Sequence, residues 1–77
     1  MDPYELKIGG AHLLVRPRED GTYEVFRGET RLAHLYPDVT SEGISWETAD
    51  WIDDEYANTI GKAIEEHEKK HNAYGPF

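Results

Sequence analysis

The sequence predicts an α+β fold: an antiparallel meander of four or five strands, then one C-terminal helix packed across one face of the sheet. Three observations predict it. Apolar and polar residues alternate early in the chain, as in half-buried strands. Glycine-containing turns separate these segments. Beyond residue 51, apolar residues recur at three- and four-residue spacing, as on one helix face. We therefore expect a single domain over residues 1–77, with the sheet at about 4–47 and the helix at about 53–71.

The first predicted hairpin turns at Gly9-Gly10, a two-residue hairpin signal. One register places all its apolar residues on one face, and it pairs Tyr4 with Val15, Leu6 with Leu13 and Ile8 with Ala11. A second hairpin follows through a three-residue loop, Glu19-Asp20-Gly21, with Gly21 in the left-handed conformation. The resulting register pairs Val15 with Val25 and Pro17 with Tyr23 on one face, and Leu14 with Phe26 and Arg16 with Glu24 on the other.

The rest of the sheet is predicted from turn signals. The segment Arg27-Gly28-Glu29-Thr30 predicts a third turn, and residues 31–36 a fourth strand that Pro37 ends. Residues 38–43 are expected to form a loop, and residues 43–47 a short fifth strand. The pattern leaves open which face Leu32 and His34 join.

Residues 53–71 carry several helix signals. Asp53 or Asp50 is the expected N-cap, and acidic residues follow in the first turn, where the helix dipole favours them. The helical apolar positions are Ile52, Tyr56, Ile60, Ala63, Ile64 and His67. Gly61 costs about 1 kcal/mol relative to alanine within a helix. Since it lies beside the apolar positions, we expect that it lets the helix approach the sheet closely.

Charge and composition exclude several classes of function. The formal net charge is −8, and one stretch, residues 38–60, contains no lysine or arginine. Its acidic residues are Asp38, Glu42, Glu47, Asp50, Asp53, Asp54 and Glu55. Such a surface repels nucleic acid and anionic lipid, and no apolar run approaches the roughly 20 residues that span a bilayer. Because the chain has no cysteine and no signal-peptide pattern, we expect a cytoplasmic protein without disulfides.

Two clusters resemble metal sites. His67-Glu68-Lys69-Lys70-His71 matches the H-E-x-x-H pattern and so resembles the zincin metalloproteases, in which two histidines hold zinc and the glutamate is the base. The surrounding lysines and glutamates predict an exposed segment, and the usual third ligand is missing downstream. The carboxylates at 50–55 lack EF-hand spacing, and helix capping accounts for them. We therefore predict no catalytic residue, no cofactor and no metal, with His67 and His71 as the weak candidates.

The sheet face away from the helix is the first candidate interaction surface. Alternation places His12, Leu14 and Phe26 there, together with Leu35. An apolar patch ringed by polar groups is typical of a protein-binding surface. The leading prediction is therefore a non-enzymatic interaction domain, with homodimerisation through this face as one form of it.

The acidic stretch is the second candidate interaction surface. Its seven carboxylates could mimic phosphates and occupy the basic site of a nucleic-acid-binding protein, as an acidic inhibitor does. The nearby aromatic residues Tyr36, Trp46, Trp51 and Tyr56 are expected to fill the seam between helix and sheet. Alternatively, acidic and aromatic side chains together could recognise a basic segment of a partner. A zinc-dependent hydrolase is the third hypothesis.

Overall fold

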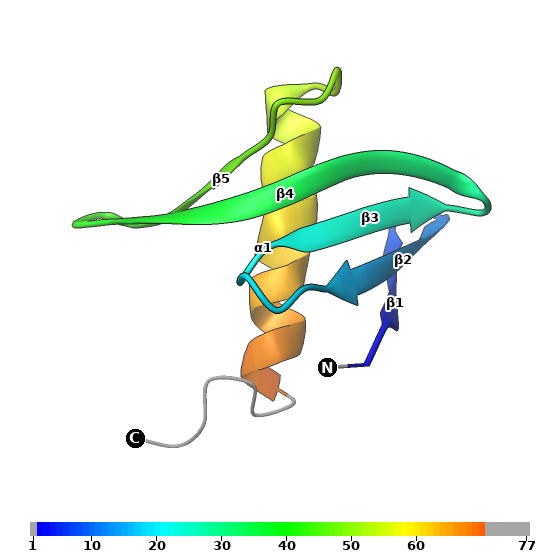
Figure 1. The fold of residues 1–77 in the computed structure, drawn as a ribbon, viewed down its shortest axis with the longest axis horizontal. Coiled ribbons are helices and arrows are strands. Elements are labelled where there is room, and N and C mark those ends of the chain that lie inside the picture. Colours follow the sequence, from blue (N-terminus) through cyan, green and yellow to red (C-terminus); the bar gives the residue numbers. More distant parts are fainter. Residues whose placement is uncertain (1, 71–77) are drawn as a thin grey trace.

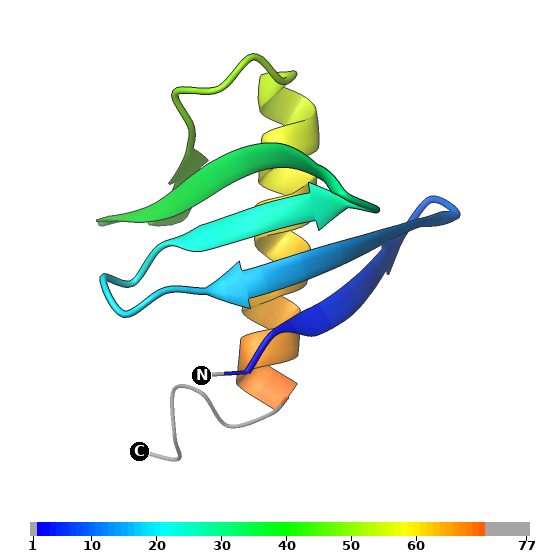
Figure 2. The same ribbon diagram turned by 45° about the vertical axis from the view of Figure 1, so that its right-hand side comes forward.

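The computed structural model describes residues 2–70, and within them it contains five strands and one helix. The strands are β1 (Tyr4–Ile8), β2 (Ala11–Pro17), β3 (Tyr23–Arg27), β4 (Thr30–Thr40) and β5 (Gly43–Glu47), and the helix is α1 (Asp54–Lys70). The strands form one antiparallel sheet in chain order (Figure 1). Helix α1 lies across one face of this sheet (Figure 2). The predicted α+β meander is confirmed, and so is its fifth strand.

The first two hairpins have the predicted registers. Tyr4 faces Val15 across β1 and β2, and Leu14 faces Phe26 across β2 and β3. The loop between β2 and β3 is closed by a hydrogen bond from the Arg18 backbone N to the Thr22 backbone O, at 2.8 Å. Gly21 lies inside that loop with φ 86°, a conformation that a residue with a Cβ rarely adopts.

The prediction that Leu35 lies on the uncovered face was wrong, because a β-bulge interrupts the pairing of β3 with β4. Arg31 faces Phe26, but the next pair joins Ala33 to Val25, so Leu32 has no partner of its own. One additional residue reverses the direction of every side chain beyond it. Leu35 and Ala33 consequently point to the helix side, where both are fully buried.

Strand β4 is longer than predicted and continues through Pro37. It pairs with β3 as far as Leu35 and with β5 from Tyr36 onward. Pro37 therefore lies beyond the end of β3, with a strand on only one side. A proline, which cannot donate a backbone hydrogen bond, is tolerated in a strand at such a position. The expected loop at 38–43 is in fact the end of β4 and a tight turn into β5.

The core fills the seam between the sheet and α1. Its buried residues are Leu6, Leu13, Val15, Tyr23, Val25, Ala33, Leu35, Trp46, Ala57, Ile60 and Ile64. Residues from all five strands and the helix contribute to it, so the core depends on the helix as much as on the sheet. Within residues 2–70, no helix is long and apolar enough to cross a membrane.

Helix α1 packs tightly on β5. Trp46 of β5 is buried there, and its Nε1 donates a hydrogen bond of 2.6 Å to Oε2 of Glu65. A Cβ built on Gly61 would overlap the indole ring of Trp46. This explains the glycine within the helix, because the indole of Trp46 occupies the space that a side chain at position 61 would need.

We predict that Gly61→Ala destabilises the protein although alanine is the better helix former. Forcing an extra methyl group into a packed seam costs about 1–3 kcal/mol, against a gain in helix propensity of about 1 kcal/mol. Because the methyl group would overlap ring atoms of the buried indole, the cost should lie in the upper part of that range. We expect a net decrease of about 1–2 kcal/mol in the free energy of unfolding, measured by urea titration followed by circular dichroism. The control Thr59→Ala, at an exposed position of α1, should not lower it, because alanine is also the better helix former there and meets no packed neighbour. An unchanged unfolding midpoint for Gly61→Ala would contradict the prediction.

Candidate functional site

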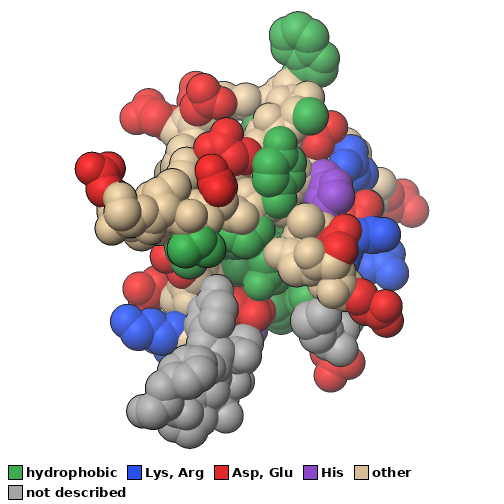
Figure 3. Space-filling model, turned by 60° about the vertical axis from the view of Figure 1, so that its left-hand side comes forward, with side chains coloured by type: hydrophobic (Ala, Val, Ile, Leu, Met, Phe, Trp, Pro, Cys, Tyr) green, Lys and Arg blue, Asp and Glu red, His purple; other side chains and the backbone are tan. Residues whose placement is uncertain are grey.

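The acidic residues of 38–60 are spread over three elements. Asp38 lies in β4 and Glu42 in the turn after it, and Glu47 ends β5. Asp50 and Asp53 lie in the connection between β5 and α1, and Asp54 and Glu55 begin the helix. On the face of the molecule drawn in Figure 3, acidic side chains are scattered, with hydrophobic side chains between them. The acidic stretch is therefore an extended surface with exposed apolar groups.

Asp50 anchors the connection between β5 and α1 to the sheet. One carboxylate oxygen, Oδ2, accepts a hydrogen bond of 2.8 Å from the backbone N of His34 in β4. The other, Oδ1, accepts one of 3.3 Å from the Arg31 guanidinium. Because β5 pairs with β4 only from Tyr36 onward, the backbone N–H of His34 has no strand partner on that edge. The Asp50 side chain takes the place of a strand there.

The same contacts change the ionisation of Asp50. The hydrogen bond from the His34 backbone, and then the positive charge of Arg31, hold the pKa of the Asp50 carboxyl below its usual value of 3.8. Partial burial acts in the opposite direction and is outweighed. Asp50 is therefore a charged structural group at neutral pH, and little of its carboxylate is available to a partner.

Trp51, the next residue, is fully exposed, at 101% of its reference area. Its neighbours on both sides are held. Asp50 is bound to β4, and the backbone N of Ile52 donates a 3.0 Å hydrogen bond to the Asp50 backbone O. Ile52 packs against the core, and Asp53 caps the helix by accepting a 2.7 Å hydrogen bond from the Glu55 backbone N. The fold thus presents one tryptophan on an anchored connection.

The position of Trp51 differs from the sequence-based expectation. Trp46 fills the seam between helix and sheet as expected, and Tyr56 is partly buried beside the core, but Trp51 lies in solvent and Tyr36 is 41% exposed. The sequence signal that could have indicated this is the run of acidic residues on both sides of Trp51, Asp50 before it and Asp53 after it. A tryptophan flanked this closely by charges is more easily placed at a surface than in a core.

The predicted patch on the uncovered sheet face is smaller than expected. Leu14 and Phe26 are neighbours across β2 and β3, but Leu14 is only 41% exposed and Phe26 is partly buried. Leu35 is in the core, as described above. His12 lies on this face, with its Nδ1 at 3.3 Å from Oε1 of Glu5. Two apolar side chains among charged ones therefore remain of the patch.

Two residues of the H-E-x-x-H pattern, His67 and Glu68, contact the strands. The ring of His67 stacks on Tyr4 of β1, with ring centroids 3.7 Å apart and planes 10° from parallel. Oε1 of Glu68 accepts a hydrogen bond of 3.4 Å from the hydroxyl of Tyr23. His71 lies outside the described residues. Among residues 2–70, no three His, Cys, Asp or Glu side chains are grouped so that they could hold a metal ion. The two described residues serve to dock the end of α1 on the sheet.

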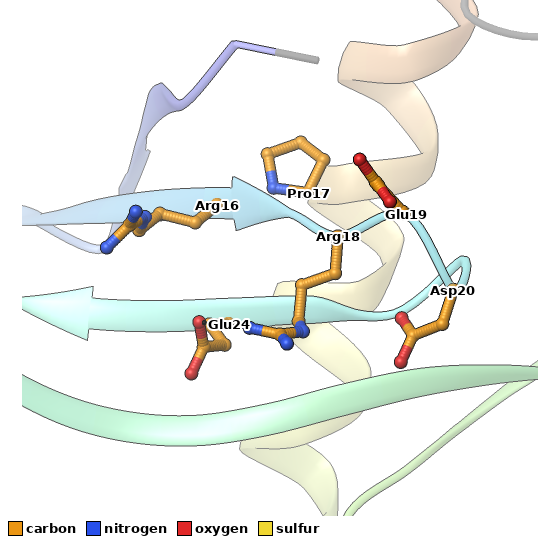
Figure 4. Close-up of a pocket in the computed structure, with 6 residues that line it drawn as sticks. All are labelled: Arg16, Pro17, Arg18, Glu19, Asp20 and Glu24. Carbon is orange, nitrogen blue, oxygen red and sulfur yellow. Dashed lines mark hydrogen bonds and ion pairs between the residues drawn. The ribbon is translucent and has the colours of Figure 1, made fainter.

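A shallow groove lies beside the loop between β2 and β3 (Figure 4). It is lined by Arg16, Pro17, Arg18, Glu19, Asp20 and Glu24. The Arg18 guanidinium donates a 3.0 Å hydrogen bond to Oε1 of Glu24, and three carboxylates face two guanidinium groups. Such a mixture does not select for either an anion or a cation. The groove is therefore a weaker candidate site than the connection that carries Trp51.

We predict that Asp50→Asn lowers the free energy of unfolding at pH 7 by about 1 kcal/mol, because it removes the charge from the three hydrogen bonds that the carboxylate accepts from His34, Arg31 and Thr48. The effect is modest because 30% of the side chain is exposed to solvent. The native pKa of Asp50 lies below its usual value of 3.8, so the native state binds this proton less readily than the unfolded state. The stabilisation is thus complete at pH values above the usual pKa of 3.8, and it is lost as the pH falls through the lower native pKa.

Urea unfolding of parent and variant at pH 7 and at about pH 3 measures this directly. The difference between the two proteins should shrink at the lower pH. The Asp20 carboxyl, whose pKa is also lowered by hydrogen bonds from Thr22, is present in both proteins and so cancels in the comparison. A difference of equal size at both pH values would show that the charge of Asp50 does not stabilise the fold.

Comparison with known proteins identifies no relative of this chain. The chain matches no protein-family model, no curated protein and no solved structure. The functional conclusion is therefore derived from the side chains themselves, and among them Trp51 with its anchored neighbours is the strongest candidate.

Proposed function

We propose that this chain is a non-enzymatic protein-interaction domain, acting in the cytoplasm, that binds its partner through Trp51. One observation carries the proposal: Trp51 is fully exposed on a connection whose neighbouring residues are held in place. Tryptophan is among the residue types that contribute most to binding at protein interfaces. It is also the side chain whose exposure to water is hardest to explain by solubility or by folding.

The energetics favour a partner that covers the indole. Burying a tryptophan removes about 150–250 Å² from water, which corresponds to a gross gain of ~4–6 kcal/mol. Leu14, already more than half covered, offers much less on the sheet face. A single covered tryptophan could therefore account for a large share of a micromolar affinity, which is about 8 kcal/mol.

The anchoring of the connection supports the same proposal. Binding to a mobile loop costs free energy, since the loop must be ordered when the partner arrives. Here Asp50 is tied to β4, Ile52 packs on the core and Asp53 caps α1. Much of that ordering is provided by folding, so the indole is presented in advance.

The other hypotheses receive less support. Homodimerisation through the sheet face loses Leu35, which leaves Leu14 and Phe26 as its apolar centre. An inhibitor that mimics phosphates needs free carboxylates, but Asp50 and Asp53 are engaged within the fold. For a zinc hydrolase, the pattern would need a third ligand close to His67, and residues 2–70 offer no such group.

We predict that Trp51→Ala abolishes partner binding and leaves the fold intact. The immobilised protein and the variant are incubated with a lysate of the native host, and the retained proteins are compared by quantitative mass spectrometry. Because Trp51 is fully exposed, the free energy of unfolding should change by less than about 0.5 kcal/mol. Leu14→Ser on the sheet face is the matched control and should leave the retained set unchanged. If Leu14→Ser loses the retained proteins and Trp51→Ala keeps them, the binding surface is the sheet face and not Trp51.

A further inference from the structure

In the described part of the chain, the acidic residues that follow Trp51 lack ion-pair partners, whereas Arg31 and Lys62 have them. Asp53, Asp54 and Glu55 follow within four residues, and none of the three forms an ion pair within residues 2–70. The nearby cations are engaged. Arg31 lies 3.5 Å from Glu24 and 3.3 Å from Asp50, and the Lys62 ammonium is 3.5 Å from Glu65. Among residues 2–70, the three acidic residues that follow the indole are therefore not neutralised by an ion pair.

Chain connectivity keeps these carboxylates close to the indole. Three residues span at most about 11 Å, so Asp54 lies within reach of any segment that covers Trp51. The helix dipole stabilises carboxylates in the first turn of α1 without neutralising them. An approaching segment therefore meets an aromatic face and formal negative charges at the same place.

We propose, on the basis of the interaction function above, that the segment bound at Trp51 is basic: an arginine-rich stretch of a partner protein. A guanidinium group stacks on the indole face, where cation–π attraction is strongest for tryptophan. Further cations of the segment pair with Asp54 and Glu55. Arginine fits better than lysine because its guanidinium is planar and more weakly hydrated.

Other occupants fit the same surface less well. Nucleic acid and anionic lipid are repelled by the acidic stretch. A second copy of the chain brings a net charge of −8 against a net charge of −8. In the groove beside the loop between β2 and β3, Arg18 is already bound to Glu24. An uncharged apolar segment could cover the indole but would leave the carboxylates without a cation.

The test uses labelled peptides of equal length and fluorescence anisotropy. One is arginine-rich, one is lysine-rich, and the third replaces each arginine by citrulline, which has nearly the same shape and no charge. We expect the arginine peptide to bind most tightly, with the citrulline peptide at least about tenfold weaker. Raising the salt from about 0.05 to about 0.5 M should weaken binding, since the charges are exposed.

Three variants locate the binding site. Trp51→Ala should weaken the arginine peptide by about tenfold, and Asp54→Asn with Glu55→Gln should do so mainly at low salt. Tyr36→Ala, at another exposed aromatic residue, is the matched control and should bind as the parent does. Light scattering across a range of protein concentrations should show one mass for all proteins.

Several outcomes would overturn the proposal. Equal affinity for the arginine and citrulline peptides would show that a cation does not contribute to binding. Unchanged binding by Trp51→Ala would show that the indole does not contribute. If the host proteins retained in the pull-down still depend on Trp51, the interaction function stands and only the basic segment is wrong. If neither assay depends on Trp51, both proposals fail. A mass that rises with concentration in the parent and not in Trp51→Ala would identify a second copy as the occupant.

Discussion

The packing of Trp46 against Gly61 is the contact on which the rest of the structure depends. It packs α1 tightly on β5, where the indole is held by the hydrogen bond to Glu65. With the helix fixed there, the six residues between Glu47 and Asp54 must connect the end of β5 to the start of α1. A short connection with both ends fixed has few paths available. Its path runs along the edge of β4 that β5 leaves unpaired.

That unpaired edge explains the role of Asp50. A backbone N–H without a partner is costly when it is partly buried, and the carboxylate satisfies the one on His34. By accepting this hydrogen bond, the side chain of Asp50 also holds its own backbone against the sheet. The following residue, Trp51, is then directed away from the core, which Ile52 contacts instead. One local requirement of the sheet thus leads to an exposed tryptophan.

The hairpins could be predicted from the sequence because their signals are local. Gly9-Gly10 and Gly21 specify turns, and the alternation of apolar residues leaves one consistent register. The bulge opposite Phe26 has no comparable signal. It places Ala33 and Leu35 in the core, and burial there is a tertiary contact that the local pattern does not encode. The helix was predicted because its spacing is long and regular. Residue type left Asp53 and Asp50 as alternative N-caps, and in the structure Asp53 caps the helix while Asp50 binds β4.

The candidate site was harder to predict for the same reason. Trp46 and Trp51 are only five residues apart and both are large and apolar, so residue type assigns both to the core. What separates them is the hydrogen bond from His34 to Asp50, between residues sixteen positions apart. The acidic residues alone do not define a binding surface, because Asp50 and Asp53 have structural roles that account for them. Trp51 has no such role within residues 2–70, since its side chain touches solvent on all sides. The indole is therefore the centre of the proposed binding surface, and the charges around it are the reason for proposing a basic partner.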